Sequence, residues 1–185
     1  KLENRPLVKG FYFVETVHKV TLGELAAQIY SFKESRSNFN CPISTSLLEK
    51  QLYSTYLSYL NPLDFAYDLK MNIDQRGSFT EILRGGSGQV SVNIIKPGIA
   101  KGNHWHHTKV EKFVVVSGTG VIRFRKIDEE KVYEYFVDGN KIQAVDIPVG
   151  YTHNIENCGN QDMVVVMWAN ETFNKDKPDT YFLEV

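Results

Sequence analysis

Three histidines and one glutamate in the second half of the sequence have the types and spacing of a metal site. His104 and His106 are two residues apart, so on a β-strand both side chains project from the same face. Glu111 returns to that face only if a turn or bulge intervenes, and the polar residues before it can supply one. His153 follows a tight turn. Three imidazoles and one carboxylate form a site for a divalent transition metal, and an open coordination position would permit catalysis.

Each of these residues also has a purely structural interpretation. A His-x-His pair occurs by chance, and either ring could be a hydrogen-bonded histidine of the core. Alternation along the strand predicts that His107 points away from the site. His18 lies far from the other histidines in the sequence, and we expect it to be structural.

Short strands must position the candidate ligands. Beyond Pro62 the apolar residues change from helical spacing to alternation, with Gly- and Pro-containing turns about every ten residues. This pattern predicts an antiparallel sandwich or barrel. The clearest strand predictions are Gln89–Ile95, Phe113–Val116, Gly120–Arg125, Val132–Val137 and Met163–Trp168.

The first sixty residues are predicted to be mostly helical, after a strand-like run at Phe11–Val14. Thr21 and Glu24 form a capping box, which predicts an amphipathic helix from Thr21 to about Phe32. We expect a loop over Lys33–Pro42 and a second helix that begins near Ser44 or Ser46 and ends at Asn61-Pro62. These patterns divide the chain into segments 1–65 and 66–185.

Composition narrows the classes of function. The 185 residues carry 21 basic and 22 acidic side chains, which argues against a nucleic-acid partner. No apolar run approaches the roughly 20 residues that span a bilayer, so no membrane partner is expected. Two cysteines fit a reducing compartment and a cytoplasmic location. Because the chain begins at Lys1 rather than Met, we expect a fragment or a processed product.

The spacing of the candidate ligands resembles the two signatures of the cupin family. Gly98, His104, His106, Glu111 and Gly118 fill every position of G-x5-HxH-x4-E-x6-G. The second signature, P-x-G-x2-H-x3-N, is filled from Pro148 to Asn157, although its leading glycine, Gly139, stands three residues too early, which predicts a longer hairpin. The resemblance covers roughly residues 66 to 185. It implies a mainly β protein with a double-stranded β-helix, the jelly-roll barrel, after a short, mostly helical segment.

A second resemblance concerns substrate. Asp74–Glu81 is similar to the D-x-R-G-x-F-x-E segment of nucleotide-sugar 4-keto 3,5-epimerases, in which the arginine and glutamate approach the nucleotide diphosphate. This implies substrate-binding roles for Arg76 and Glu81. His104 occupies the position of that family's base, and Glu111 the position of a lysine. Taken alone, Asp74–Glu81 is better explained as a turn followed by an edge strand, and the cupin signatures downstream favour the sugar-nucleotide interpretation.

The amino-terminal residues resemble the late part of an extended short-chain dehydrogenase/reductase domain of the sugar-nucleotide type. The resemblance rests on Phe11–Val17 and Val20–Glu24. The Gly-rich nucleotide loop and the Tyr-x3-Lys pair of that family are absent from these 185 residues, so NADPH is expected only in an intact two-domain protein. A reductase tail before a metal cupin is similar to the carboxyl-terminal half of bifunctional capsular-polysaccharide enzymes.

Together the resemblances imply a substrate and a reaction. The substrate is a UDP-linked 2-acetamido-2,6-dideoxy-4-hexulose, a 4-keto-6-deoxy amino sugar of the UDP-N-acetyl-L-fucosamine pathway. The cupin half inverts C3, and the missing reductase half then reduces C4 with NADPH. The implied metal is divalent, with zinc as the first choice, and the implied assembly is a homodimer that pairs through the cupin barrels, with Tyr181 and Phe182 as candidate contacts.

Two roles conflict at His104, because the cupin pattern makes it a ligand and the epimerase resemblance makes it the base. We favour a ligand, since His106, Glu111 and His153 need a fourth partner. The base is then Tyr151, Lys109 or a hydroxide on the metal, although Tyr151 could be a turn aromatic and Lys109 a solvated charge. The expected catalytic residues are thus His104, Glu111 and Tyr151, and Lys109 joins the substrate-binding set. The competing functions are a metal-dependent cupin dioxygenase and a non-catalytic sugar-binding cupin.

Overall fold

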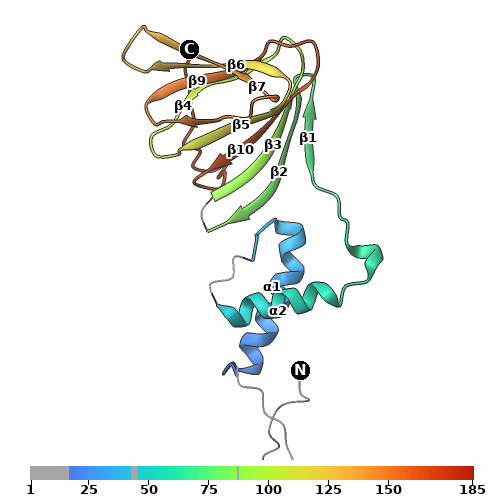
Figure 1. Cartoon of the computed structure of the whole chain (residues 1–185). Coiled ribbons are helices and arrows are strands. Elements are labelled where there is room, and N and C mark those ends of the chain that lie inside the picture. The colour runs from blue at the N-terminus through green and yellow to red at the C-terminus, as the bar shows by residue number, and fades with distance from the viewer. Residues whose placement is uncertain (1–16, 43–45, 87) are drawn as a thin grey trace, which may run out of the picture.

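A computed structural model describes residues 17–42, 46–86 and 88–185 and contains a β-barrel with two helices outside it (Figure 1). The strand-like run predicted at Phe11–Val14 lies outside the described residues. Within the described part of the chain, no helix is long and apolar enough to cross a bilayer.

Helix α1 (Leu22–Asn38) begins at the predicted capping box. The Thr21 hydroxyl accepts a hydrogen bond from the Glu24 amide, and the Glu24 carboxylate accepts one from the Thr21 amide. The prediction of a loop over Lys33–Pro42 was wrong for its first six residues, because α1 continues to Asn38. Its Lys, Glu and Arg side chains are good helix formers, so the helix continues through them on a mostly exposed face.

Helix α2 (Leu47–Ser58) begins directly after Ser46, which was one of the two predicted starting points. Phe32 of α1 is completely buried and packs against Tyr53 and Tyr56 of α2, with ring centroids 5.1 and 5.9 Å apart. The rest of the predicted apolar stripe of α1 is mostly uncovered, and Leu22 is 85% exposed. A single 3-10 turn, η1 (Pro62–Asp64), follows α2.

Among the described residues, eleven strands form two antiparallel sheets that face each other, as the sequence predicts. In order across the first sheet, the strands are β1 (Met71–Asp74), β2 (Gly77–Gly85), β3 (Gly88–Ile95), β10 (Met163–Ala169), β5 (Glu111–Ser117) and β8 (Ala144–Ile147). In the second sheet they are β11 (Tyr181–Phe182), β4 (Ala100–Trp105), β9 (Tyr151–Asn157), β6 (Thr119–Lys126) and β7 (Val132–Asp138). The five strands predicted from alternation are confirmed as β3, β5, β6, β7 and β10.

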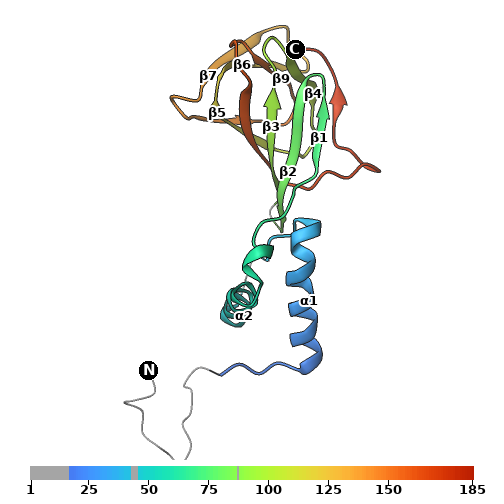
Figure 2. The ribbon, with the colours of Figure 1, turned by 90° about the vertical axis from the view of Figure 1, so that its right-hand side faces the viewer.

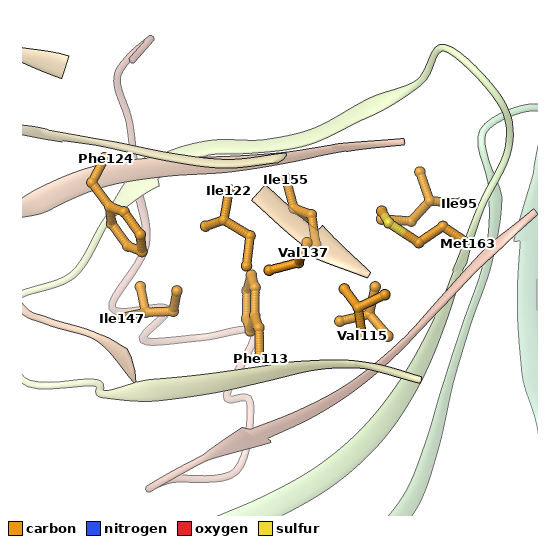
Figure 3. Close-up of a cluster of buried hydrophobic side chains, with 10 residues drawn as sticks. Ile95, Phe113, Val115, Ile122, Phe124, Val137, Ile147, Ile155 and Met163 are labelled. Atoms are coloured by element: carbon orange, nitrogen blue, oxygen red, sulfur yellow. The ribbon is translucent and has the colours of Figure 1, made fainter. Parts of the chain in front are cut away.

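The apolar core fills the space between the two sheets (Figure 3). Phe113 and Val115 of β5 belong to the same buried cluster as Ile122 and Phe124 of β6, which lies in the opposite sheet. Each fully buried aliphatic or aromatic side chain stabilises the fold by about 1.5–3 kcal/mol relative to exposure. This core holds the two sheets at a fixed separation, and so fixes the side chains that they direct at each other.

Main-chain hydrogen bonds join the helical segment to the barrel. The Cys41 amide donates to the Arg84 carbonyl, and the Arg84 amide donates to the Phe39 carbonyl, both at 2.6 Å. Figures 1 and 2 show the helices beyond the end of the β2–β3 hairpin, away from the interior of the barrel. The division of the chain at residue 65 stays a prediction.

Candidate metal centre

The four predicted ligands come from both sheets and meet inside the barrel. His104 lies on β4 and pairs in register with His153 on the neighbouring strand β9. His106 follows the end of β4, and Glu111 opens β5 in the opposite sheet. One donor atom from each of the four residues lies within 4.8 Å of the others.

A bulge in β4 turns His104 toward the site. The register with β9 shifts between Gly102 and His104, and Asn103 between them has a left-handed φ of 59°. Gly102 itself has a φ of 114°, and a Cβ there would lie 2.7 Å from the carbonyl oxygen of His153. Only glycine fits this position, because any side chain would collide with the strand that carries a ligand.

Glu111 lies between two of the imidazoles. Its Oε2 is 3.3 Å from His106 Nε2 and 3.4 Å from His153 Nε2. The His104 ring centroid is 4.6 Å from that of His153 and 5.0 Å from that of His106. His106, His153 and Glu111 are buried, so water competes little for their donor atoms.

Burial and mutual charge set the protonation of the cluster. Burial is the largest cause and the neighbouring His153 the second of a lowered His104 pKa of about 4, and the Glu111 carboxylate offsets only part of this shift. Burial would raise the pKa of Glu111, but the imidazoles of His106 and His153 and the Lys109 ammonium hold it well below its usual range. At neutral pH, His104 therefore has a free lone pair and Glu111 is a carboxylate. Both are in the state that binds a cation.

The donor set fits a divalent metal. His153 Nε2 is fully buried, and its polar neighbour among the described residues is the Glu111 carboxylate at 3.4 Å, which does not have the geometry of a hydrogen bond. A buried nitrogen that is satisfied this poorly is costly unless a further group binds it. Three imidazole nitrogens and one carboxylate are ligands that zinc, iron and other divalent transition metals accept. The ligand types do not select zinc over the others.

The cluster opens into a cavity of about 470 Å³ between the sheets. Lys109 lines it, with its Nζ 3.7 Å from Glu111 Oε1 and 3.3 Å from the Thr180 hydroxyl. Glu81 also lines it, and Arg84 holds the Glu81 carboxylate at 2.6 Å. The structure thus brings two of the three predicted substrate-binding residues to the metal cavity.

Arg76 lies in an adjoining cavity. Its guanidinium is 2.6 Å from the Asp74 carboxylate, and more than half of its side chain is exposed. Lys101 lines both cavities and donates to Asn93 Oδ1 at 2.7 Å; burial lowers the pKa of its ammonium. Sequence reasoning missed Lys101, because an isolated lysine on a polar strand has no distinguishing signal.

The side chain of Tyr151 lies outside the metal cavity, although its main-chain carbonyl is 3.4 Å from His153 Nδ1. It packs against the core and lines a third cavity with Phe124, Tyr133 and Tyr135. No contact with the metal cavity supports its predicted role as the base. His107 is exposed, as the alternation predicts, and His18 is exposed as well.

The fold and the donor set define the class of protein, a cupin with a candidate divalent-metal centre inside its barrel. Residues 72–181 match the family model of the polysaccharide biosynthesis C-terminal domain, and the chain belongs to that family.

Relatives agree with this family. The chain is 43% identical over 173 residues to a UDP-2-acetamido-2,6-β-L-arabino-hexul-4-ose reductase of Pseudomonas aeruginosa, covering 93% of this chain and 46% of the relative. It is 59% identical to the capsular polysaccharide assembling protein CapF of Staphylococcus aureus, with a TM-score of 0.92 over 98% of this chain and 49% of that one. The chain therefore spans about half the length of these relatives. An oxalate decarboxylase of Lactobacillus farciminis, 16% identical with a TM-score of 0.51 over 63% of this chain and 34% of that one, shares the fold alone.

Proposed function

We propose that this chain is the epimerase half of a bifunctional enzyme of capsular-polysaccharide precursor synthesis. It inverts C3 of a UDP-linked 2-acetamido-2,6-dideoxy-4-hexulose, and a reductase half that these 185 residues lack reduces C4 with NADPH. The observation that carries the proposal is the His104, His106, Glu111 and His153 cluster at the wall of a cavity that also contains Lys109 and Glu81.

The chemistry of a 4-keto sugar suits this cavity. The C3 proton lies beside the C4 carbonyl, so its removal leaves an enolate whose charge is mostly on the C4 oxygen. His104, His106, Glu111 and His153 would hold a divalent metal, which would supply Lewis-acid chemistry to this cavity. Return of the proton to the opposite face inverts C3. Of the two side chains considered for proton transfer, Lys109 lines the metal cavity and Tyr151 does not; as an ammonium beside Glu111, Lys109 is placed to return a proton to C3.

The relatives support the substrate class. The Pseudomonas aeruginosa relative is named as a reductase of UDP-2-acetamido-2,6-β-L-arabino-hexul-4-ose, and the ending hexul-4-ose denotes a carbonyl at C4. The Staphylococcus aureus relative is named for capsular polysaccharide assembly. On this proposal, residues 1–65 are the end of the reductase half, and the uncovered apolar stripe of α1 is the face that the rest of that half covers.

Deuterium exchange tests the proposed reaction. The purified chain, loaded with metal in D₂O, should incorporate deuterium at C3 of the UDP-4-keto-6-deoxy amino sugar, which mass spectrometry and NMR would detect. It should leave NADPH unconsumed, because the nicotinamide-binding loop and the Tyr-Lys pair are absent. NADPH oxidation would contradict this division of labour. A fully metal-loaded chain without exchange would instead favour the dioxygenase or the sugar-binding alternative.

We also propose that the chain forms a homodimer through its barrel. Strands β1 and β11 are sheet edges, and each carries exposed apolar side chains, Ile73 at 72% and Phe182 at 77%. Uncovered edges of this kind favour pairing with a second copy. Light scattering at micromolar concentration should give twice the monomer mass, and Phe182→Asp should shift the equilibrium toward the monomer. A monomeric mass for the unmodified chain would refute the proposal.

A further inference from the structure

The loop between two of the candidate ligands depends on a distant carboxylate. Asp179 accepts hydrogen bonds from the amides of His107, Thr108 and Lys109 at 2.9, 2.7 and 2.9 Å, and from the Thr108 hydroxyl at 3.0 Å. These amides belong to the turn that carries the chain from His106 to Glu111. A single carboxylate with several backbone donors fixes such a turn more firmly than local contacts do.

The same residue also holds one of the ligands. The main-chain carbonyl of Asp179 lies at hydrogen-bonding distance from His106 Nδ1. When Nδ1 carries the proton and donates to this carbonyl, Nε2 of the ring is left with its lone pair and faces Glu111. Hydrogen bonds of this kind orient metal-binding histidines and fix their tautomer.

The residues after Asp179 contact the strand that carries His104. Tyr181 and Phe182 form β11, which pairs with β4 so that Phe182 lies opposite His104. The Lys109 ammonium reaches the Thr180 hydroxyl. One short segment, residues 179–182, therefore contacts both the turn from His106 to Glu111 and strand β4, which carries His104.

We propose that Asp179 is a positioning residue for the metal centre. Through its contacts, Asp179 couples metal binding to the docking of the carboxyl-terminal segment 179–182. The proposal rests on the candidate metal site and does not depend on the reaction. Because such coupling is reciprocal, Asp179 raises the affinity for metal, and the bound metal stabilises the docked segment.

The first test compares Zn²⁺ affinity by competition with a chromophoric chelator. Asp179→Ala should weaken Zn²⁺ binding by about 10- to 100-fold, the range typical of residues that orient metal ligands. Asp179→Asn keeps an acceptor oxygen of the same shape without the charge, so its loss should be smaller. The control is Asp176→Ala, which removes an exposed carboxylate three residues before Asp179 and should leave the affinity unchanged.

The second test needs no substitution and therefore does not depend on whether a variant folds. Amide hydrogen exchange of the unmodified chain should slow at residues 107–109 and 181–182 when Zn²⁺ is added. Zn²⁺ affinity within twofold of the unmodified chain for a folded Asp179→Ala, or exchange at these amides that ignores Zn²⁺, would overturn the proposal. Failure of the unmodified chain to bind Zn²⁺ would overturn it too, and would do so without reference to any sugar substrate.

Discussion

Replacing His153 by alanine should remove most of the bound metal from the purified chain. Its ring is completely buried, its Nε2 lies 3.4 Å from the Glu111 carboxylate inside the ligand cluster, and alanine supplies no ligand atom in its place. Substitutions that only disturb the orientation of a ligand weaken metal binding by about 10- to 100-fold, so removal of a ligand should cost at least that much. Elemental analysis after dialysis against a weak chelator would measure the loss, and His106→Ala should behave in the same way.

The control for both variants is His18→Ala, which removes an exposed imidazole outside the barrel. It should keep about one metal per chain. The thermal midpoint gives a second measurement, because a ligand that binds only the folded state stabilises it. Addition of Zn²⁺ should raise the midpoint of the unmodified chain and of His18→Ala, and should raise it much less for the two ligand variants. Normal metal content in both His106→Ala and His153→Ala would sink the ligand assignment.

The sequence predicted the ligand cluster chiefly because the spacing of all four residues resembles the cupin signatures, and local rules added support for only part of it. Two histidines at i and i+2 share a face of a strand, and a turn before Glu111 brings the carboxylate back to them. Alternating apolar residues likewise predicted β3, β5, β6, β7 and β10. The strands that carry His104 and His153 were not among the runs predicted from alternation. Polar residues are frequent along β4 and β9, and their pairing depends on neighbours far away in the sequence.

Tertiary contacts explain what the sequence did not predict. Asp179 lies about seventy residues after the loop that it holds, and no spacing rule connects the two. Lys101 becomes notable only when folding brings it between two cavities. Tyr151 shows the opposite case. It lies only two residues before His153 in the sequence, yet its side chain lines a separate cavity. Proximity along the chain is thus a weak guide to which residues share a cavity.

Glu111→Ala and Arg76→Ala should impair the proposed C3 exchange in different ways. Glu111 lies between two imidazoles and beside Lys109, so its loss removes a ligand and leaves a buried ammonium without its carboxylate. We expect the exchange rate at saturating substrate to fall by at least about a hundredfold, a loss of roughly 3 kcal/mol in transition-state stabilisation. Metal content measured on the same sample should fall with the rate.

Arg76 is expected to act on binding alone, because it lies in the adjoining cavity and its partner in the structure is Asp74. If its guanidinium binds the diphosphate, Arg76→Ala should raise the half-saturating substrate concentration about tenfold, which is the loss of one charge-assisted contact of about 1.4 kcal/mol. Arg76→Lys keeps the charge without the two-pronged geometry and should recover only part of that loss. The saturated exchange rate and the metal content should stay near those of the unmodified chain. Equal effects of Glu111→Ala and Arg76→Ala on rate and on binding would contradict the separation of a reactive cavity from a diphosphate-binding one.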